Sequence, residues 1–144
     1  MKKKLQIGFT LIELMVVMLI IIILATMAIA SYLQATQTAR DGKRRTDIEA
    51  VRQALILRRQ DLGSYPAGDF PTIAGSLVTN NYLSAPAPTD PQAVALNPAY
   101  RRNDPLSTTA FCICATLEGS RGNATSNACA GLGATTGGFY CAQQ

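Results

Sequence analysis

The sequence predicts an α+β fold: a long N-terminal helix, apolar in its first half, packed on a small antiparallel sheet with a disulfide-bounded C-terminal region. Three observations predict it. Residues 5–30 are almost wholly apolar, no proline precedes Gly63, and the apolar β-type runs and all four cysteines lie in the last third of the chain. Because one compact core would not separate composition in this way, we expect a membrane-seeking element followed by a small exported domain of residues 63–144.

The apolar segment of residues 9–30 has the length of a membrane-spanning helix, about 33 Å. Lys2, Lys3 and Lys4 precede it, and such basic runs mark the cytoplasmic end of a membrane segment. A secretory signal peptide ending at Ala28-Ile29-Ala30, or an uncleaved anchor, would have the same outline. Neither explains Glu13, because a carboxylate inside an apolar run costs about 2–3 kcal/mol.

Glu13 needs a cationic partner that its own helix does not offer. The lysines lie nine or more residues before it, and no cation lies one turn away. Cleavage after Gly8 would create a cation, because it exposes the α-amino group of Phe9. In a stack of staggered identical helices, that amine can approach the Glu13 of a neighbour, which favours assembly and penalises a wrong register.

The N-terminus resembles that of the precursors of type IV pilins and pseudopilins. The resemblance lies in the lysine run, in Gly8-Phe9-Thr10-Leu11-Ile12-Glu13 and in the unbroken apolar helix that follows. It implies that residues 1–8 are a leader peptide, that a prepilin peptidase cuts between Gly8 and Phe9, and that Phe9 is N-methylated. It also implies that Glu13 docks subunits, and that residues 9–30 serve first as a transmembrane helix and then as a filament-core helix.

The same resemblance implies a type IV pilin-like fold and a set of partners. These are further copies of the chain in a helical homopolymer, the peptidase, the assembly machinery at the inner membrane, and the membrane itself before assembly. The precursor would lie in the cytoplasmic membrane with its N-terminus inside and its C-terminal domain outside. The assembled product would be an extracellular pilus filament.

The helix is expected to continue as an amphipathic segment through residues 31–62. One face carries a hydrophobic stripe with helical spacing, made of Ile48, Val51, Leu55 and Leu62. Asp41 and Arg45 have the spacing of an i, i+4 ion pair, and Gly42 is the expected point of a bend. Gly63 supplies the stop signal.

Charge and composition argue against an enzyme and give no strong case for nucleic acid. The net charge is +4, but three of the thirteen basic residues are the N-terminal lysines, and histidine is absent. We predict no catalytic residue and no cofactor. The pairs Arg44-Arg45, Arg58-Arg59 and Arg101-Arg102 are interpreted as a solvated surface balanced by nearby acids, with nucleic acid left as an uncertain partner.

The exported domain combines a proline-rich stretch with short strands. Residues 63–109 are expected to be loop-like, with a short helix from Ile73 to Leu83 capped by Thr72. Apolar runs predict strands at Thr109–Leu117 and Phe139–Ala142, and a third at Ala99–Arg102.

Four cysteines, Cys112, Cys114, Cys129 and Cys141, are disulfide candidates if this end is exported. Cys112 and Cys114 share a strand face, which disfavours a bond between them. The nested pairing, Cys112–Cys141 with Cys114–Cys129, is slightly preferred over the crossed one. A four-cysteine zinc site is the weaker alternative, since the spacing lacks paired C-x2-C knuckles, and no metal is expected. The C-terminal hairpin resembles the disulfide-bounded region of type IV pilins.

Two further motifs have simple alternative explanations. Asn123-Ala124-Thr125 matches an N-glycosylation acceptor but also suits a flexible loop. Asp90 and Asp104 suggest a calcium site, since major pseudopilins bind calcium, but both also fit turns beside prolines.

The sequence therefore predicts a structural, non-enzymatic subunit of a type IV pilus, with attachment, motility or DNA uptake as its outputs. A pseudopilin of a secretion or competence system is the second hypothesis. A soluble domain secreted by the Sec route and beginning at Ser31 is the third.

Overall fold

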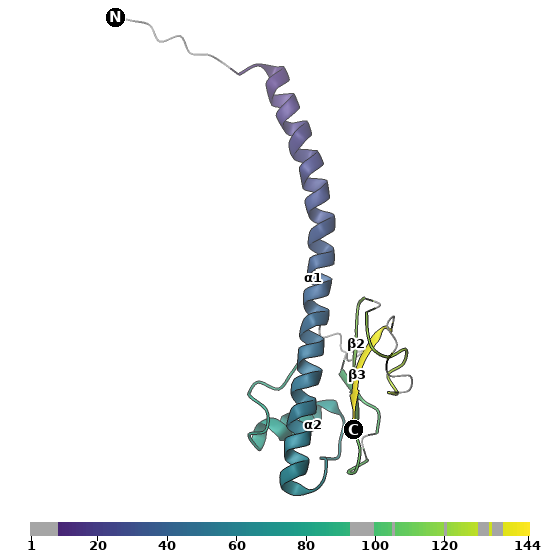
Figure 1. Ribbon diagram of the computed structural model, residues 1–144. Helices are drawn as coiled ribbons and strands as arrows, with labels where there is room; N and C mark the ends of the chain where they lie inside the picture. The colour runs from purple at the N-terminus through teal and green to yellow at the C-terminus, as the bar shows by residue number, and fades with distance from the viewer. Residues whose placement is uncertain (1–8, 93–99, 105, 120, 130–132, 134–136) are drawn as a thin grey trace, which may run out of the picture. The chain divides into compact units, whose positions relative to one another are not determined.

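The computed structural model describes residues 9–92, 100–104, 106–119, 121–129, 133 and 137–144. The chain forms two compact units, Met1–Thr36 and Gln37–Gln144. One helix, α1 (Leu11–Leu62), belongs to both (Figure 1). The predicted long N-terminal helix is confirmed, with its first residue two positions later than expected.

In the first unit the described residues from Leu11 to Thr36 are helical. Its large apolar side chains are exposed throughout, from Phe9 at 80% to Leu33 at 58%. Three of its hydroxyls are satisfied within the helix, since Thr26, Ser31 and Thr36 each donate to a carbonyl three or four residues earlier. By length and composition, α1 is apolar enough to cross a membrane.

The second unit has its own hydrophobic core. The helical stripe of Ile48, Val51 and Leu55 is buried, and it packs in one cluster with α2 (Phe70–Thr79) and with the inner face of a sheet. Leu62, the last expected member of the stripe, is 58% exposed instead. The helix ends there and the chain turns away at Gly63, whose φ of 75° is readily adopted only by glycine.

The sheet has three antiparallel strands in the order β1 (Tyr100–Arg102), β2 (Cys112–Thr116) and β3 (Phe139–Gln143). All three lie within the predicted runs or one residue beyond them, and Ala99, the expected first residue of the first strand, lies outside the described residues. Alternation along β2 places Ile113 and Ala115 in the core and Cys114 in a second cluster on the other face. The sheet thus separates the main core from a small cysteine-lined core.

The short helix α2 begins earlier than predicted. Its N-cap is Asp69, whose carboxylate accepts a hydrogen bond from the backbone N–H of Thr72, the residue predicted to be the cap. Pro71 lies in the first turn, where a missing N–H costs nothing. The helix ends at Thr79, capped by Asn80, so the predicted extension to Leu83 is wrong.

The disulfide pairing is the crossed one, so the preferred nested pairing is wrong. The structure pairs Cys112 with Cys129 and Cys114 with Cys141. The strand register explains the second bond, because Cys114 lies directly opposite Cys141, whereas Cys112 lies opposite Gln143. Sequence spacing does not determine this register, which is why the partners could not be deduced from it.

Candidate functional site

The start of α1 presents an exposed carboxylate on an apolar helix. The hydroxyl of Thr10 accepts a hydrogen bond from the backbone N–H of Glu13 at 3.3 Å, which caps the first turn. Thr10 and Glu13 have the Thr-x-x-Glu spacing of a capping box, a signal of this helix start that the prediction from sequence missed. Gly8 lies outside the described residues, and Phe9, the predicted methylation site, is exposed.

Glu13 is the one charged residue between Phe9 and Thr36. Its side chain is exposed, and so are its large apolar neighbours Ile12, Leu14 and Met15. In water this arrangement has little consequence. Once the apolar surface is covered by lipid or by other helices, the carboxylate loses its hydration and needs a cation beside it.

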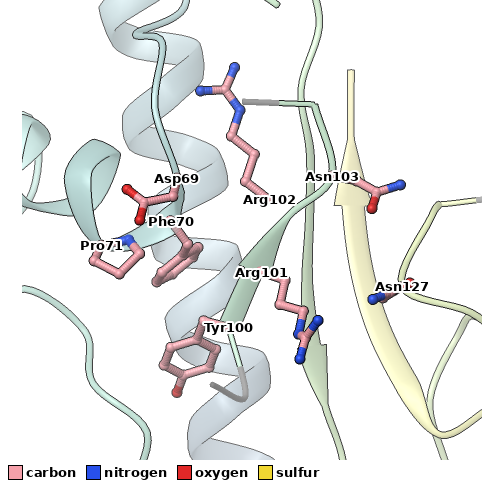
Figure 2. Close-up of a pocket in the computed structure, with 8 residues that line it drawn as sticks. All are labelled: Asp69, Phe70, Pro71, Tyr100, Arg101, Arg102, Asn103 and Asn127. Carbon is pink, nitrogen blue, oxygen red and sulfur yellow. The ribbon is translucent and has the colours of Figure 1, made fainter. Parts of the chain in front are cut away.

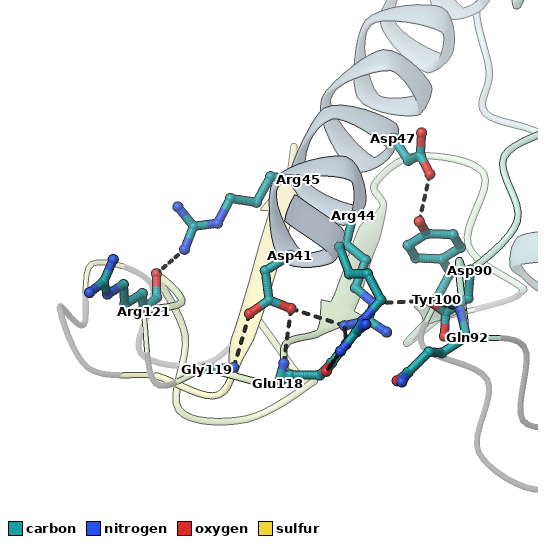
Figure 3. Close-up of polar contacts among 11 residues, drawn as sticks. Asp41, Arg44, Arg45, Asp47, Asp90, Gln92, Tyr100, Glu118, Gly119 and Arg121 are labelled. Carbon is teal, nitrogen blue, oxygen red and sulfur yellow. Dashed lines mark hydrogen bonds and ion pairs between the residues drawn. The ribbon is translucent and has the colours of Figure 1, made fainter. Parts of the chain in front are cut away.

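A second group of polar residues, which we name the Arg44 cluster, lies in the second unit (Figure 3). It consists of Arg40, Asp41, Arg44, Asp90 and Glu118. Arg44 is only 3% exposed, and its guanidinium donates to Asp41 and Asp90 at 2.9 Å and to Glu118 at 2.8 Å. Asp41 also accepts from the backbone N–H groups of Glu118 and Gly119, both at 2.9 Å. Three parts of the chain are thereby joined: α1, the segment at residue 90 and the turn after β2.

The pKa values within the cluster follow from these contacts. Hydrogen bonds from Arg40, and then from Arg44, lower the pKa of Glu118 to about 2. Burial by itself would lower the pKa of Arg44, but its hydrogen bonds to Asp90, Glu118 and Asp41 outweigh burial and raise it. The charged forms of Arg44 and Glu118 are therefore stabilised by their neighbours, which suits a structural clamp.

Three predictions about charged residues are wrong. Arg44 and Arg102 are buried rather than solvated, and Arg102 donates to the carbonyls of Pro66, Gly68 and Ser107. Asp41 pairs with Arg44 three residues on, not with Arg45. Arg45 instead donates to the carbonyl of Arg121 and lies over the ring of Tyr140, 5.7 Å from its centroid.

The calcium interpretation also finds no support in the geometry. A carboxylate oxygen of Asp90 is bound to Arg44, and Asp104 belongs to no group of possible metal ligands within the described residues. The sulfur atoms of Cys112, Cys114 and Cys129 do lie within 4.8 Å of one another. All three are in disulfides, so they offer no thiolate to a zinc ion.

Asn123, in the apparent glycosylation motif, has a structural role. Its side-chain N–H donates to the carbonyl of Cys141 at 2.8 Å, and its side-chain oxygen accepts from the N–H of Cys141 at 2.7 Å. The amide thus pairs with β3 much as another strand would. A glycan on this nitrogen would compete with that pairing, so loop flexibility is not the reason for an asparagine at this position.

Comparison with known proteins gives one match. Residues 3–29 match the family model described as the prokaryotic N-terminal methylation motif, which spans Gly8, Phe9 and Glu13. No curated protein and no solved structure matches the chain. The match covers the N-terminal segment alone, so the function must be argued from that segment together with the geometry of the second unit.

Proposed function

We propose that this chain, a type IV pilin-like or pseudopilin protein, is a major structural subunit of a type IV pilus and polymerises through α1. Its leader motif implies processing by a prepilin peptidase and assembly into a pilus or pseudopilus. Its apolar helix fits a precursor in the inner membrane that is later assembled. The motif also favours a structural rather than an enzymatic role.

One observation carries the proposal: the helical segment up to Thr36 exposes its large apolar side chains, and Glu13 is the one charged residue on it. Such a segment requires cover, and identical segments in a bundle supply it without a second protein. Cleavage between Gly8 and Phe9 would place a new amine four residues before Glu13 and two residues before α1 begins at Leu11. Pairing that amine with the Glu13 of a neighbouring copy would neutralise both charges and set the stagger between subunits.

The test is Glu13→Gln, which removes the charge and keeps the shape of the side chain. We expect the variant to be cleaved normally, with a mature N-terminus at Phe9 that is one methyl group heavier. We expect filaments on the cell to fall at least about tenfold, because an unpaired amine would remain in the apolar core. Intact mass measures processing, and electron microscopy measures filaments.

Leu14→Ala is the matched control, since it alters the neighbouring exposed side chain without touching the charge. Wild-type filament numbers from Glu13→Gln would refute the charge-pairing role. A mature N-terminus at Ser31 in the wild-type protein would refute the filament function as a whole and indicate a secreted soluble domain.

A pseudopilin is the second candidate. Tyr65-Pro66 and the stretch from Asn81-Tyr82-Leu83 to Asp90-Pro91 resemble the segment that follows the long helix in major pseudopilins and some pilins, which favours it. The doubly bridged C-terminal hairpin favours a pilin instead. Long extracellular filaments would decide for the pilus. Assemblies confined to the periplasm, together with loss of protein export on deletion, would decide for the pseudopilin. Attachment, motility and DNA uptake are outputs to be tested once filaments are seen.

A further inference from the structure

The two disulfides lie side by side but in different surroundings. Cys114 and Cys141 are 1% and 3% exposed, and they join directly opposed positions of β2 and β3. Cys112 is half-buried at the first residue of β2, and its partner Cys129 is 8% exposed in the segment before residue 130. Access to a thiol in solution therefore differs between the two bonds.

Cys129 also has an unfavourable backbone conformation. Its φ is 51°, in the left-handed region where the β-carbon of any residue other than glycine is crowded. Such a conformation persists only where the surroundings enforce it. For Cys129, the surroundings are the bond to Cys112 and the packing against Cys114, Ala124 and Cys141, so breaking that bond removes one of the two constraints.

Within the described part of the chain, residues 125–128 have few polar contacts with the sheet, although Cys129 itself packs with Cys114, Ala124 and Cys141. The N–H of Ala128 donates to the hydroxyl of Ser126, a hydrogen bond that lies inside the segment itself. The sulfur atoms of Cys141 and Cys114 approach the carbonyl oxygens of Ser126 and Asn127 at 3.6 and 3.3 Å, but a disulfide sulfur carries no proton to donate. The residues just before this segment are better anchored, through Asn123 and the bridge between Ala124 and Phe139.

Asn127, from the same segment, lines a surface hollow of about 450 Å³ (Figure 2). Asn127 and Asn103, which follows β1, lie on the same side of this view, across from Phe70 and Pro71. The N–H of Asn103 donates to the carbonyl of Cys112. Two residues that line the hollow thus neighbour the more exposed disulfide: Asn103 through its hydrogen bond to Cys112, and Asn127 two positions before Cys129.

We propose that Cys112–Cys129 is a thiol–disulfide exchange site for a dithiol reductant, whereas Cys114–Cys141 is a protected structural bond. A thiolate of the dithiol attacks the sulfur of Cys112, the bond to Cys129 breaks, and Cys129 leaves as a thiolate that takes a proton from water. The second thiol group of the reductant, as a thiolate, then attacks the reductant's first sulfur, which is bonded to Cys112 in the mixed disulfide. This step releases the Cys112 thiolate, which is protonated, and the reductant leaves as a cyclic disulfide after giving two electrons to the protein.

Reduction at this site frees residues 125–129 and leaves the sheet intact. The register of β2 and β3 is kept by Cys114–Cys141 and by the backbone ladder. The redox state of the exported domain would thus change one wall of the hollow without unfolding the protein. This inference concerns the second unit and does not depend on the assembly role proposed for Glu13.

The test is partial reduction of the folded full-length protein with increasing dithiothreitol, followed by acid quenching, alkylation with iodoacetamide and peptide mass mapping. We expect Cys112 and Cys129 to be alkylated at a dithiothreitol concentration at least about tenfold below that needed for Cys114 and Cys141. Simultaneous labelling of all four cysteines, or earlier labelling of Cys114 and Cys141, would overturn the proposal.

Two controls separate protection by the fold from local sequence effects. In concentrated guanidinium chloride the two bonds should open together, and a persistent difference there would overturn the claim that the fold protects Cys114–Cys141. The double variant Cys112→Ser, Cys129→Ser should keep Cys114–Cys141 and resist dithiothreitol as that bond does in the wild type.

Hydrogen exchange of the partly reduced wild type should rise in residues 125–129 and stay unchanged in β2 and β3.

Discussion

Arg44 is a buried residue of the second unit on which three carboxylates converge. It is buried and bound to three carboxylates, and two of these come from positions 46 and 74 residues away in the chain. Taking a charge out of water is costly, and pairing and hydrogen bonding offset that cost for Arg44. Arg52, by contrast, forms a simple pair with Glu49 at the surface of the same helix.

Replacing Arg44 should therefore destabilise the protein far more than replacing Arg52. We expect Arg44→Met to lower the free energy of unfolding by about 3–5 kcal/mol, because it leaves three carboxylates near one another without their shared cation. Arg52→Ala should cost no more than about 1 kcal/mol. Urea unfolding of the full-length chain in detergent would measure both, and equal losses would mean that the cluster is not a clamp.

Glu118 makes the stability that the Arg44 cluster provides depend on pH in the acid range. Its pKa in the folded protein is lowered from 4.5 to about 2, chiefly by Arg40. A lowered folded-state pKa means that the stabilisation is complete above pH 4.5 and is lost as the pH falls through about 2. The free energy of unfolding, measured in urea at pH values from 4.5 down to 2, should fall less for Glu118→Gln than for the wild type. Parallel curves for the two proteins would contradict this.

Among the helices and strands, those predicted well from sequence are the ones that the spacing of apolar residues and prolines along a short segment determines. The absence of proline before Gly63 and the stripe of Ile48, Val51 and Leu55 are enough to predict α1. The β-type runs locate the strands for the same reason. The disulfide partners and the burial of Arg44 are not predictable, because both depend on contacts between distant segments whose register no local pattern determines.

The candidate site divides in the same way. Gly8, Phe9 and Glu13 could be proposed from sequence because all three lie in one short run, and the methylation motif matches there. Their roles in cleavage and docking stay predictions. The start of α2 is misplaced from sequence because Thr72 competes with Asp69 as a capping residue, and a proline in the first turn favours the earlier start.

The segment that covers the outer edge of β3 depends on two glycines. Gly122 and Gly137 form a bridge, and a β-carbon added at Gly137 would lie 1.9 Å from the carbonyl oxygen of Ala124. Gly138, its neighbour, has nothing within 4 Å of the same added atom. We expect Gly137→Ala to cost about 1–3 kcal/mol, since the backbones must separate. Gly138→Ala is the control, and equal melting temperatures for the two variants would contradict the close approach.

At the scale of the whole molecule, the two units face different requirements. The first exposes almost all of its apolar surface, and within the described residues no buried side chain precedes Asp41. The second contains the core, the sheet and both disulfides. The core that folds the protein therefore lies in the second unit, whereas the assembly role proposed above belongs to the first, and α1 runs through both.

A chain that begins at Gln37 should consequently fold but not assemble. Its helical core contacts begin at Ile48, so eleven residues of helix would still precede the first core position. We expect a monomer in detergent-free buffer with the pairs Cys112–Cys129 and Cys114–Cys141, measured by size-exclusion chromatography and disulfide mapping. The chain that begins at Phe9 should require detergent or form filaments, because its exposed apolar helix has no cover of its own. If the shortened chain is unfolded, residues 9–36 contribute to folding as well as to assembly. If it polymerises, the assembly surface lies in the second unit rather than at Glu13.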